Sequence, residues 1–200
     1  MTSQPAGGPW GQGVTERFLG STISPTSRGF GPLPAMIIGF GYGIAGALVL
    51  IAGATAFTAA LVVLMVWRGG TAMLLAERAG VPPWQRALAV VLNLVAEGAV
   101  IVSAAVWAQR HESGAGPLAV GFLALAGALL LGYARMRIRA SSGSDAPDGP
   151  YGVASREVRL LVIAVGLLAG AAYWPLVVVA VLAHAAVIGH LIRLRIILKD

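Results

Sequence analysis

The sequence predicts an all-α integral membrane protein with six transmembrane helices. Hydrophobic residues make up 58% of the 200 residues and charged residues only 11%, whereas a soluble domain carries about 25% charged residues. Several apolar runs reach about 17–20 residues, the length that crosses a hydrocarbon core of roughly 30 Å. The sequence has no alternation with a period of two residues, which a membrane β-barrel would require.

The predicted elements follow one another with short connections. Residues 1–31 are polar and rich in Gly, Ser, Thr and Pro, so we expect a flexible cytoplasmic tail, because such a segment buries little apolar surface. Residues 32–200 form the expected six-helix transmembrane domain. Its spans are placed at 35–52, 54–68, 87–109, 117–133, 158–173 and 175–193, with a minimal link near Gly53 between the first two.

Two kinds of site are excluded. The chain has no cysteine, which rules out thiol catalysis and zinc held by thiolates. The first span contains Gly39, Gly41, Gly43 and Gly46. This run does not follow a strand, so it is no dinucleotide-binding loop. We expect these glycines to permit close approach of neighbouring helices.

The basic residues predict the orientation in the membrane. If the N-terminus is cytoplasmic and the chain crosses six times, all fourteen Lys and Arg residues except Arg110 fall on the cytoplasmic side. This is the positive-inside pattern, and it places both termini in the cytoplasm. The composition, rich in Gly, Ala and Arg, favours a bacterial inner membrane. Topology and anionic headgroups account for the net charge of +6, so we expect no nucleic-acid partner.

The third span carries polar side chains on one face. Gln85, Ala89, Asn93 and Glu97 recur every four residues, which places them on the same side of a helix. At about 1.5 Å per residue, Asn93 and Glu97 lie roughly 10 and 16 Å into the span. Polar groups at that depth indicate a functional site. Asn93 and Glu97 are therefore candidate polar residues of a cavity. One interpretation is a protonated or hydrogen-bonded glutamate that lines the cavity, and the other is an ion pair between Glu97 and Arg68, either direct or through Asn93.

The stretch from Val66 to Gly98 has the helix–link–helix spacing of a known signature. It resembles the CDP-alcohol phosphatidyltransferase family, whose signature is D-x-x-D-G-x-x-A-R, eight residues, G, three residues, D, three residues, D. In that family the carboxylates hold two divalent metals and the last Asp is the general base, which is two-metal phosphoryl transfer. Aligned without gaps, the signature positions fall on Arg68, Thr71, Ala72, Leu75, Ala76, Gln85, Ala89 and Asn93, and none keeps the signature residue.

Two further segments resemble the inositol-phosphate branch of the same family. They are Gly132–Arg137, at the end of the fourth span, and Ser155–Leu160, at the start of the fifth. In that branch such arginines help to bind a phosphate group. The resemblance implies that Arg135, Arg137, Arg156 and Arg159 bind a phosphate or headgroup, while positive-inside topology alone is the alternative explanation for them.

The resemblance, combined with the lost signature, implies a catalytically inactive homologue. Arg68 would repel a divalent ion, Ala89 supplies no ligand and Asn93 cannot act as a carboxylate base. We therefore expect no metal, no cofactor and no catalytic residue. The protein would bind anionic membrane lipids or their headgroups, or would associate as a homodimer or as a heterodimer with an active homologue.

Two other functions stay open from the sequence. One is an active, divergent phosphotransferase of phospholipid biosynthesis, which would move a group from a CDP-lipid to an alcohol, release CMP and use Mg²⁺ or Mn²⁺. It needs convergent carboxylates, and Glu97 is the one acidic residue within the expected spans. The other is a small transporter or channel, which inverted repeats would favour, although no clear repeat is visible.

Overall fold

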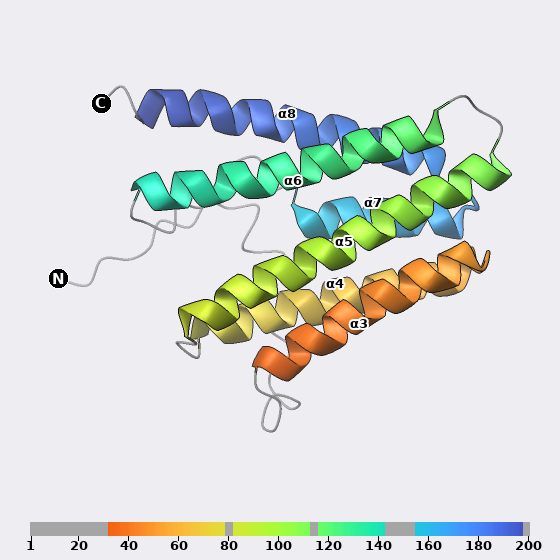
Figure 1. Ribbon diagram of the computed structural model, residues 1–200, viewed down its shortest axis with the longest axis horizontal. Helices are drawn as coiled ribbons and strands as arrows, with labels where there is room; N and C mark the ends of the chain where they lie inside the picture. The colour runs from red at the N-terminus through yellow and green to blue at the C-terminus, as the bar shows by residue number, and fades with distance from the viewer. Residues whose placement is uncertain (1–31, 79–81, 113–115, 143–154, 198–200) are drawn as a thin grey trace.

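The computed structural model is a bundle of helices, as the sequence predicted (Figure 1). It describes residues 32–78, 82–112, 116–142 and 155–197. The expected tail, residues 1–31, lies outside the described residues. The helices are α3 (Pro32–Ile51), α4 (Thr55–Arg78), α5 (Pro83–His111), α6 (Pro117–Ser142), α7 (Arg156–Leu168) and α8 (Tyr173–Ile197).

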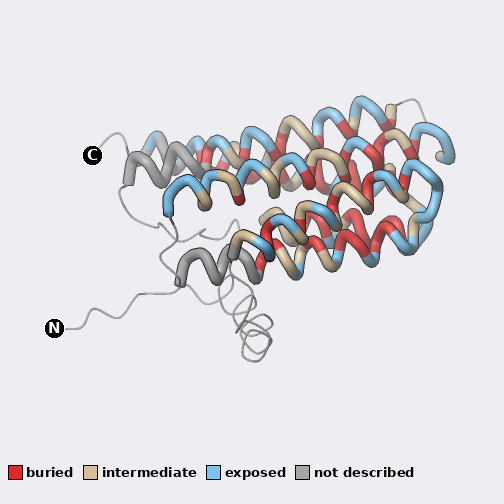
Figure 2. Tube along the Cα trace, turned by 60° about the horizontal axis from the view of Figure 1, so that its bottom comes forward, coloured by how far each residue is buried: buried red, intermediate tan, exposed pale blue. Residues whose placement is uncertain are grey.

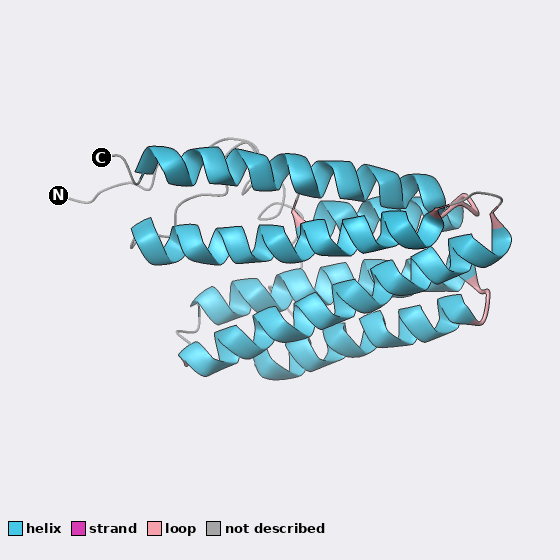
Figure 3. Ribbon diagram, turned by 45° about the horizontal axis from the view of Figure 1, so that its top comes forward, coloured by secondary structure: helices cyan, strands magenta, loops and turns pink. Residues whose placement is uncertain are grey.

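The helices form two groups joined by α5 and α7. Helix α3 packs against α4 and α5, and α6 packs against α8, while α5 also contacts α6, and α7 contacts α4 and α8. Figure 3 shows the pair α6 and α8 on one side of the bundle and the group α3, α4 and α5 on the other. In Figure 1, α7 begins well inside the end of the bundle at which α4 and α6 end. The first turn of α7 therefore lies beside the interior of its neighbours.

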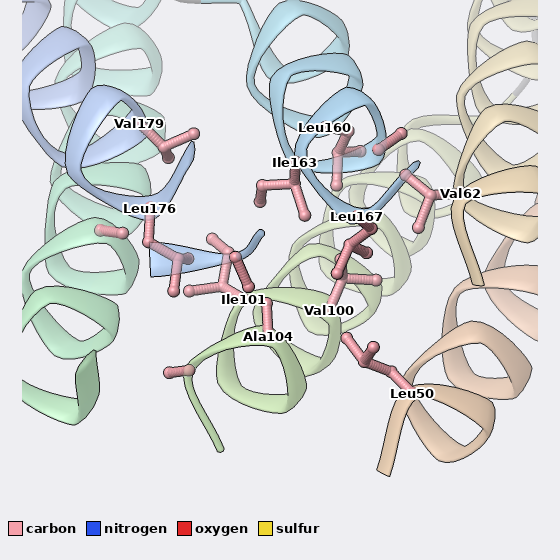
Figure 4. Close-up of a cluster of buried hydrophobic side chains, with 14 of the residues drawn as sticks. Leu50, Val62, Val100, Ile101, Ala104, Leu160, Ile163, Leu167, Leu176 and Val179 are labelled. Atoms are coloured by element: carbon pink, nitrogen blue, oxygen red, sulfur yellow. The ribbon is translucent and has the colours of Figure 1, made fainter. Parts of the chain in front are cut away.

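The core lies where α7 meets the other helices. Figure 4 shows buried side chains from α3, α4, α5, α7 and α8 pointing toward one another. Helix α7 contributes Leu160, Ile163 and Leu167 to this cluster. Most large exposed residues are apolar and lie on the outward faces (Figure 2). Such a surface suits contact with lipid, because a soluble protein rarely exposes contiguous apolar area of this extent.

The glycines of α3 allow the close packing that the sequence predicted, with one exception. A Cβ added at Gly43 would lie 2.8 Å from both Ala96 Cβ and Met65 Sδ, so α3 approaches α4 and α5 closely there. The prediction is wrong for Gly41, which is exposed and has no neighbouring atom within 4 Å of an added Cβ. Four glycines within eight residues cannot all face one side of a helix.

Four of the helices are long and apolar enough to cross a membrane. In the described residues these stretches are Leu33–Ile51, Pro83–His111, Pro117–Ala134 and Tyr173–Ile192. The apolar part of α4 is the shorter stretch Thr55–Gly70. Helix α7 has 13 residues, or roughly 20 Å. It ends before the expected boundary at 173 because the chain turns through Gly170, whose φ is +70°.

A carboxylate joins the end of α5 to the start of α8. Glu112 Oε1 accepts hydrogen bonds from the backbone N–H groups of Ala172 at 2.6 Å and Tyr173 at 3.2 Å. These donors belong to the N-terminus of α8, where N–H groups lack partners within the helix and a negative charge is favourable.

Replacing Glu112 with alanine is expected to destabilise the fold by about 1–2 kcal/mol, because the N-terminus of α8 loses its acceptor. Thermal unfolding in detergent should show a melting temperature lower by about 2–8 °C. The exposed neighbour Gln109, replaced by alanine, is the control and should leave the melting temperature unchanged. Equal melting temperatures for the two variants would contradict the capping role.

Candidate functional site

The polar face predicted for the third span exists on α5. Ala89 and Glu97 are buried and Gln85 and Asn93 are half-buried, whereas Val91 and Val95 on the same helix are exposed. The four-residue spacing therefore directs this face into the bundle. It is the face on which α5 meets the first turns of α7.

Glu97 is held by an arginine from α7. Arg159 Nη2 lies 2.6 Å from Glu97 Oε1, and Arg159 Nε donates a hydrogen bond to the same oxygen at 2.8 Å. The two residues are 3% and 2% exposed. The sequence suggested Arg68 as the cation for Glu97. The ion pair that the structure shows is with Arg159, which the resemblance had assigned to a phosphate pocket.

Arg156, the first residue of α7, lies close to Gly69 on α4 and to the neighbourhood of Asn93 on α5. A Cβ added at Gly69 would lie 2.8 Å from Arg156 Nη1 and 3.4 Å from Asn93 Oδ1. Gly69 follows the first signature position, Arg68, and Asn93 is the last signature position. The guanidinium group of Arg156 therefore lies where α4 and α5 bring together the neighbourhood of Arg68 and Asn93, the two ends of the stretch that resembles the signature.

Local sequence explains why both arginines arrive here. Ser155 caps α7, and its Oγ accepts a hydrogen bond from the backbone N–H of Val158 at 3.3 Å. The cap starts the helix at Arg156, and residues three apart share a helix face. Arg156 and Arg159 therefore both face the polar side of α5. Gly69 has no side chain, which leaves room for the Arg156 guanidinium.

The two arginines differ in their hydrogen bonding. Arg159 uses Nε and Nη2 for the carboxylate of Glu97. The same two atoms of Arg156 are buried and have no hydrogen-bond partner in the part of the chain that the structure describes. Buried polar groups usually have a partner, because leaving one unsatisfied costs free energy. Arg156 therefore presents two donors without an acceptor at this site.

The remaining predicted residues are only partly placed. The guanidinium carbon of Arg68 lies 5.0 Å from the centre of the Trp67 ring, and the Arg68 side chain is half-buried. The other positions belong to α4 or α6, but their side chains lie outside the described residues; they are Thr71, Ala72, Leu75, Ala76, Arg135 and Arg137. The structure thus brings Asn93, Glu97, Arg156 and Arg159 together.

The residues at this site do not suit a divalent metal. Arg68 on α4 and Asn93 on α5 stand at positions where the signature has metal-binding carboxylates. The guanidinium group of Arg156 lies near Asn93, since both approach Gly69. Mg²⁺ and Mn²⁺ prefer carboxylate oxygens, and a guanidinium group at this distance repels them. Among the described residues no group of three His, Cys, Asp or Glu side chains is close enough to hold a metal.

Sequence reasoning missed Gly69, because a glycine carries no chemical group of its own. The available signal was its position, directly after Arg68 and within a helix, where glycine is unfavourable unless a neighbour needs the space. The link between Glu97 and Arg159 was also missed. The i, i+3 spacing of Arg156 and Arg159 predicts a shared face, but nothing local shows which helix that face meets.

Comparison with known proteins supports the fold. No protein-family model and no curated protein matches the sequence. The chain is similar to the crystal structure of Mycobacterium tuberculosis phosphatidylinositol phosphate synthase with CDP-DAG bound, with a TM-score of 0.61 and 19% sequence identity over 89% of this chain and 92% of that chain. The predicted phosphatidyltransferase-like bundle is therefore confirmed as a fold: this chain has the helical architecture of that synthase.

Proposed function

We propose that this protein is a catalytically inactive relative of the CDP-alcohol phosphatidyltransferases that binds an anionic lipid or its phosphate-bearing headgroup. The observation that carries the proposal is the position of Arg156. Its guanidinium group lies against Gly69, which Asn93 also approaches, and it has two donors that lack acceptors among the described residues.

The chemistry at this point favours binding over transfer. Two-metal phosphoryl transfer requires carboxylates that gather cations around the phosphates. Here the signature positions supply Arg68, Ala89 and Asn93 instead. A guanidinium group binds phosphate oxygens directly through parallel N–H donors. The signature positions therefore retain positive charge for an anionic group, but their residues include no carboxylate that could activate an attacking alcohol.

The proposal includes a location in the bacterial inner membrane, with six crossings and both termini in the cytoplasm. The positive-inside rule supports this orientation, because all Lys and Arg residues except Arg110 fall on the cytoplasmic side of a six-crossing topology. Helix α7 has 13 residues, and it packs against α4 and α8 on one side while Leu161, Val165 and Leu168 are exposed on the other. The proposal counts it as one of the six crossings. Pairing with a second copy or with an active homologue is proposed from the resemblance alone.

An assay of CMP release tests the absence of transfer. Purified protein in nanodiscs would be incubated with CDP-diacylglycerol, Mg²⁺ or Mn²⁺, and candidate alcohols including inositol phosphate. We expect no CMP above the level of empty nanodiscs, while an active phosphatidylinositol phosphate synthase serves as the positive control. Metal-dependent CMP release by this protein would overturn the proposal and establish the divergent phosphotransferase instead.

A lipid-binding measurement tests the second part of the proposal, the binding of an anionic lipid. Native mass spectrometry of protein released from nanodiscs of mixed zwitterionic and anionic lipids should show anionic lipid retained in preference to phosphatidylcholine. Equal retention of both lipid classes would remove the support for a headgroup-binding function.

A further inference from the structure

We infer that the face formed by α4 and α7 contacts a locally thinned bilayer, in which the headgroups beside this face are drawn toward the membrane centre. The partner is a lipid surface, and it consists of acyl chains shorter than those that match α6 and α8. The inference rests on the membrane location in the proposed function. It does not depend on headgroup binding or on the absence of transfer.

The helices of the bundle differ in apolar length. The stretches Pro117–Ala134 of α6 and Tyr173–Ile192 of α8 have 18 and 20 residues, or about 27 and 30 Å, which is close to the thickness of a hydrocarbon core. The stretch Thr55–Gly70 of α4 measures about 24 Å, and α7, with 13 residues, about 20 Å. Because α4 packs against α7, the two short helices lie side by side.

Both short helices present apolar side chains outward. On each helix the exposed residues recur every three or four positions, so they form one stripe along it. The stripes consist of Val63 and Trp67 on α4 and of Leu161, Val165 and Leu168 on α7. An apolar face of this kind at membrane depth contacts acyl chains, and the height of the apolar face sets the hydrocarbon thickness that it matches.

Arg68 is the residue that shortens α4. It is the one charged residue between Thr55 and Ala76, and a charged side chain inside the hydrocarbon core is costly. Its guanidinium carbon lies 5.0 Å from the centre of the exposed Trp67 ring, and tryptophan is typical of the boundary between lipid and water. With leucine in place of Arg68, the apolar run of α4 would extend to Ala76 and measure about 33 Å.

The inner end of α7 lies near the level of Arg68. Nη1 of Arg156, the first residue of α7, lies 2.8 Å from a Cβ added at Gly69, the residue after Arg68. The apolar stretches of the two helices therefore end together, and neither compensates for the other. A bilayer of full thickness beside this face would surround Arg68 with hydrocarbon. Thinning is less costly, because the bilayer deforms at a modest cost per ångström of mismatch.

The first experiment measures thermal unfolding in nanodiscs made from one phosphatidylcholine at a time, with dimyristoleoyl, dipalmitoleoyl, dioleoyl or dieicosenoyl chains. A single zwitterionic headgroup keeps headgroup binding out of the comparison. We expect the wild-type protein to be most stable with the shorter chains. Arg68→Leu should move the optimum by at least one member of the series toward longer chains, because α4 then matches them.

Arg110→Leu is the matched control for this series. It also replaces an exposed arginine with leucine, but on α5, whose apolar stretch has 29 residues and is already long enough to cross a bilayer. We expect this variant to keep the optimal chain length of the wild-type protein. A shift equal to that of Arg68→Leu would mean that any added leucine has this effect, and it would contradict the role of the α4 and α7 face.

A depth measurement locates the effect on α4. The chain contains no cysteine, so a spin label can be attached to one introduced cysteine, and its accessibility to oxygen and to a water-soluble nickel complex reports its depth. In dioleoylphosphatidylcholine, the label of Trp67→Cys should lie about 2 Å from the polar boundary, and about 14 Å from it when Arg68→Leu is added. The label of Tyr133→Cys, exposed near the inner end of the α6 stretch, should keep its depth.

Three results would overturn the inference. The first is an equal optimal chain length for wild-type protein and Arg68→Leu. The second is a deep label in Trp67→Cys with Arg68 present, which would show that α4 crosses a bilayer of full thickness. The third is a disulfide between copies of Val165→Cys together with a label in Trp67→Cys that oxygen does not reach, which would assign this face to a second copy.

Failure of the proposed function gives different results. A protein that does not insert into any of these bilayers contradicts the proposed membrane location itself. Equal retention of anionic and zwitterionic lipids contradicts the proposed headgroup binding and leaves the chain-length series unaffected, because that series uses one headgroup throughout.

Discussion

Replacing Glu97 with leucine is expected to destabilise the protein by about 3–5 kcal/mol, because Arg159 would keep a buried charge without its carboxylate. The pair lies between α5 and α7, and both residues are almost completely buried. Denaturation in detergent with increasing dodecyl sulfate measures the loss. The same substitution should also weaken phosphate binding, since α7 carries Arg156 on the same face.

The double variant Glu97→Leu with Arg159→Leu provides the matched control. Removing both charges leaves neither one unpaired, and replacing a buried pair by apolar residues is often neutral. We therefore expect the double variant to regain most of the stability lost by either single variant. Additive losses would show that the two side chains do not interact as the structure indicates.

The second large effect is expected for Gly166→Ala, at the end of α7. An added Cβ would collide with Pro175 Cγ and would lie 2.8 Å from the backbone oxygen of Ala171. A proline ring and a main-chain oxygen cannot rotate away, so the turn between α7 and α8 would have to open. Overpacking of this kind costs about 3 kcal/mol, which lowers the melting temperature by about 6–12 °C.

Gly132→Ala is the control for this prediction. Gly132 lies in α6, and an added Cβ there meets no atom within 4 Å. Alanine favours a helix by about 1 kcal/mol over glycine, so this variant should unfold at the same temperature or a higher one. If Gly166→Ala and Gly132→Ala behave alike, the close contact between α7 and Pro175 is not present in solution.

The site shows that two proteins can share a fold while their side chains at the corresponding place differ in chemistry. The architecture is shared with a phosphatidylinositol phosphate synthase, but function depends on the side chains at the site and not on the fold. At the meeting point of α4, α5 and α7, a guanidinium group lies beside Asn93, where the resemblance leads one to expect a carboxylate. An arginine and a divalent cation both attract phosphate, and only the metal also activates a nucleophile.

The sequence alone determined the helical elements and the inward face of α5. Apolar length, turn residues and the four-residue spacing of Asn93 and Glu97 are local properties, and each follows from the geometry of a single helix. The sequence did not determine where α7 ends, because the apolar run after Arg156 does not show that the chain turns at Gly170.

Tertiary structure alone decided which groups meet. Glu97 and Arg159 are 62 residues apart, and Arg156 contacts Gly69 from a different helix. Periodicity reports the face on which a side chain lies, but it does not report which helix covers that face. That choice depends on how the helices pack together, and here the packing of α7 against α4 and α5 brings Arg159 to Glu97 and Arg156 to Gly69.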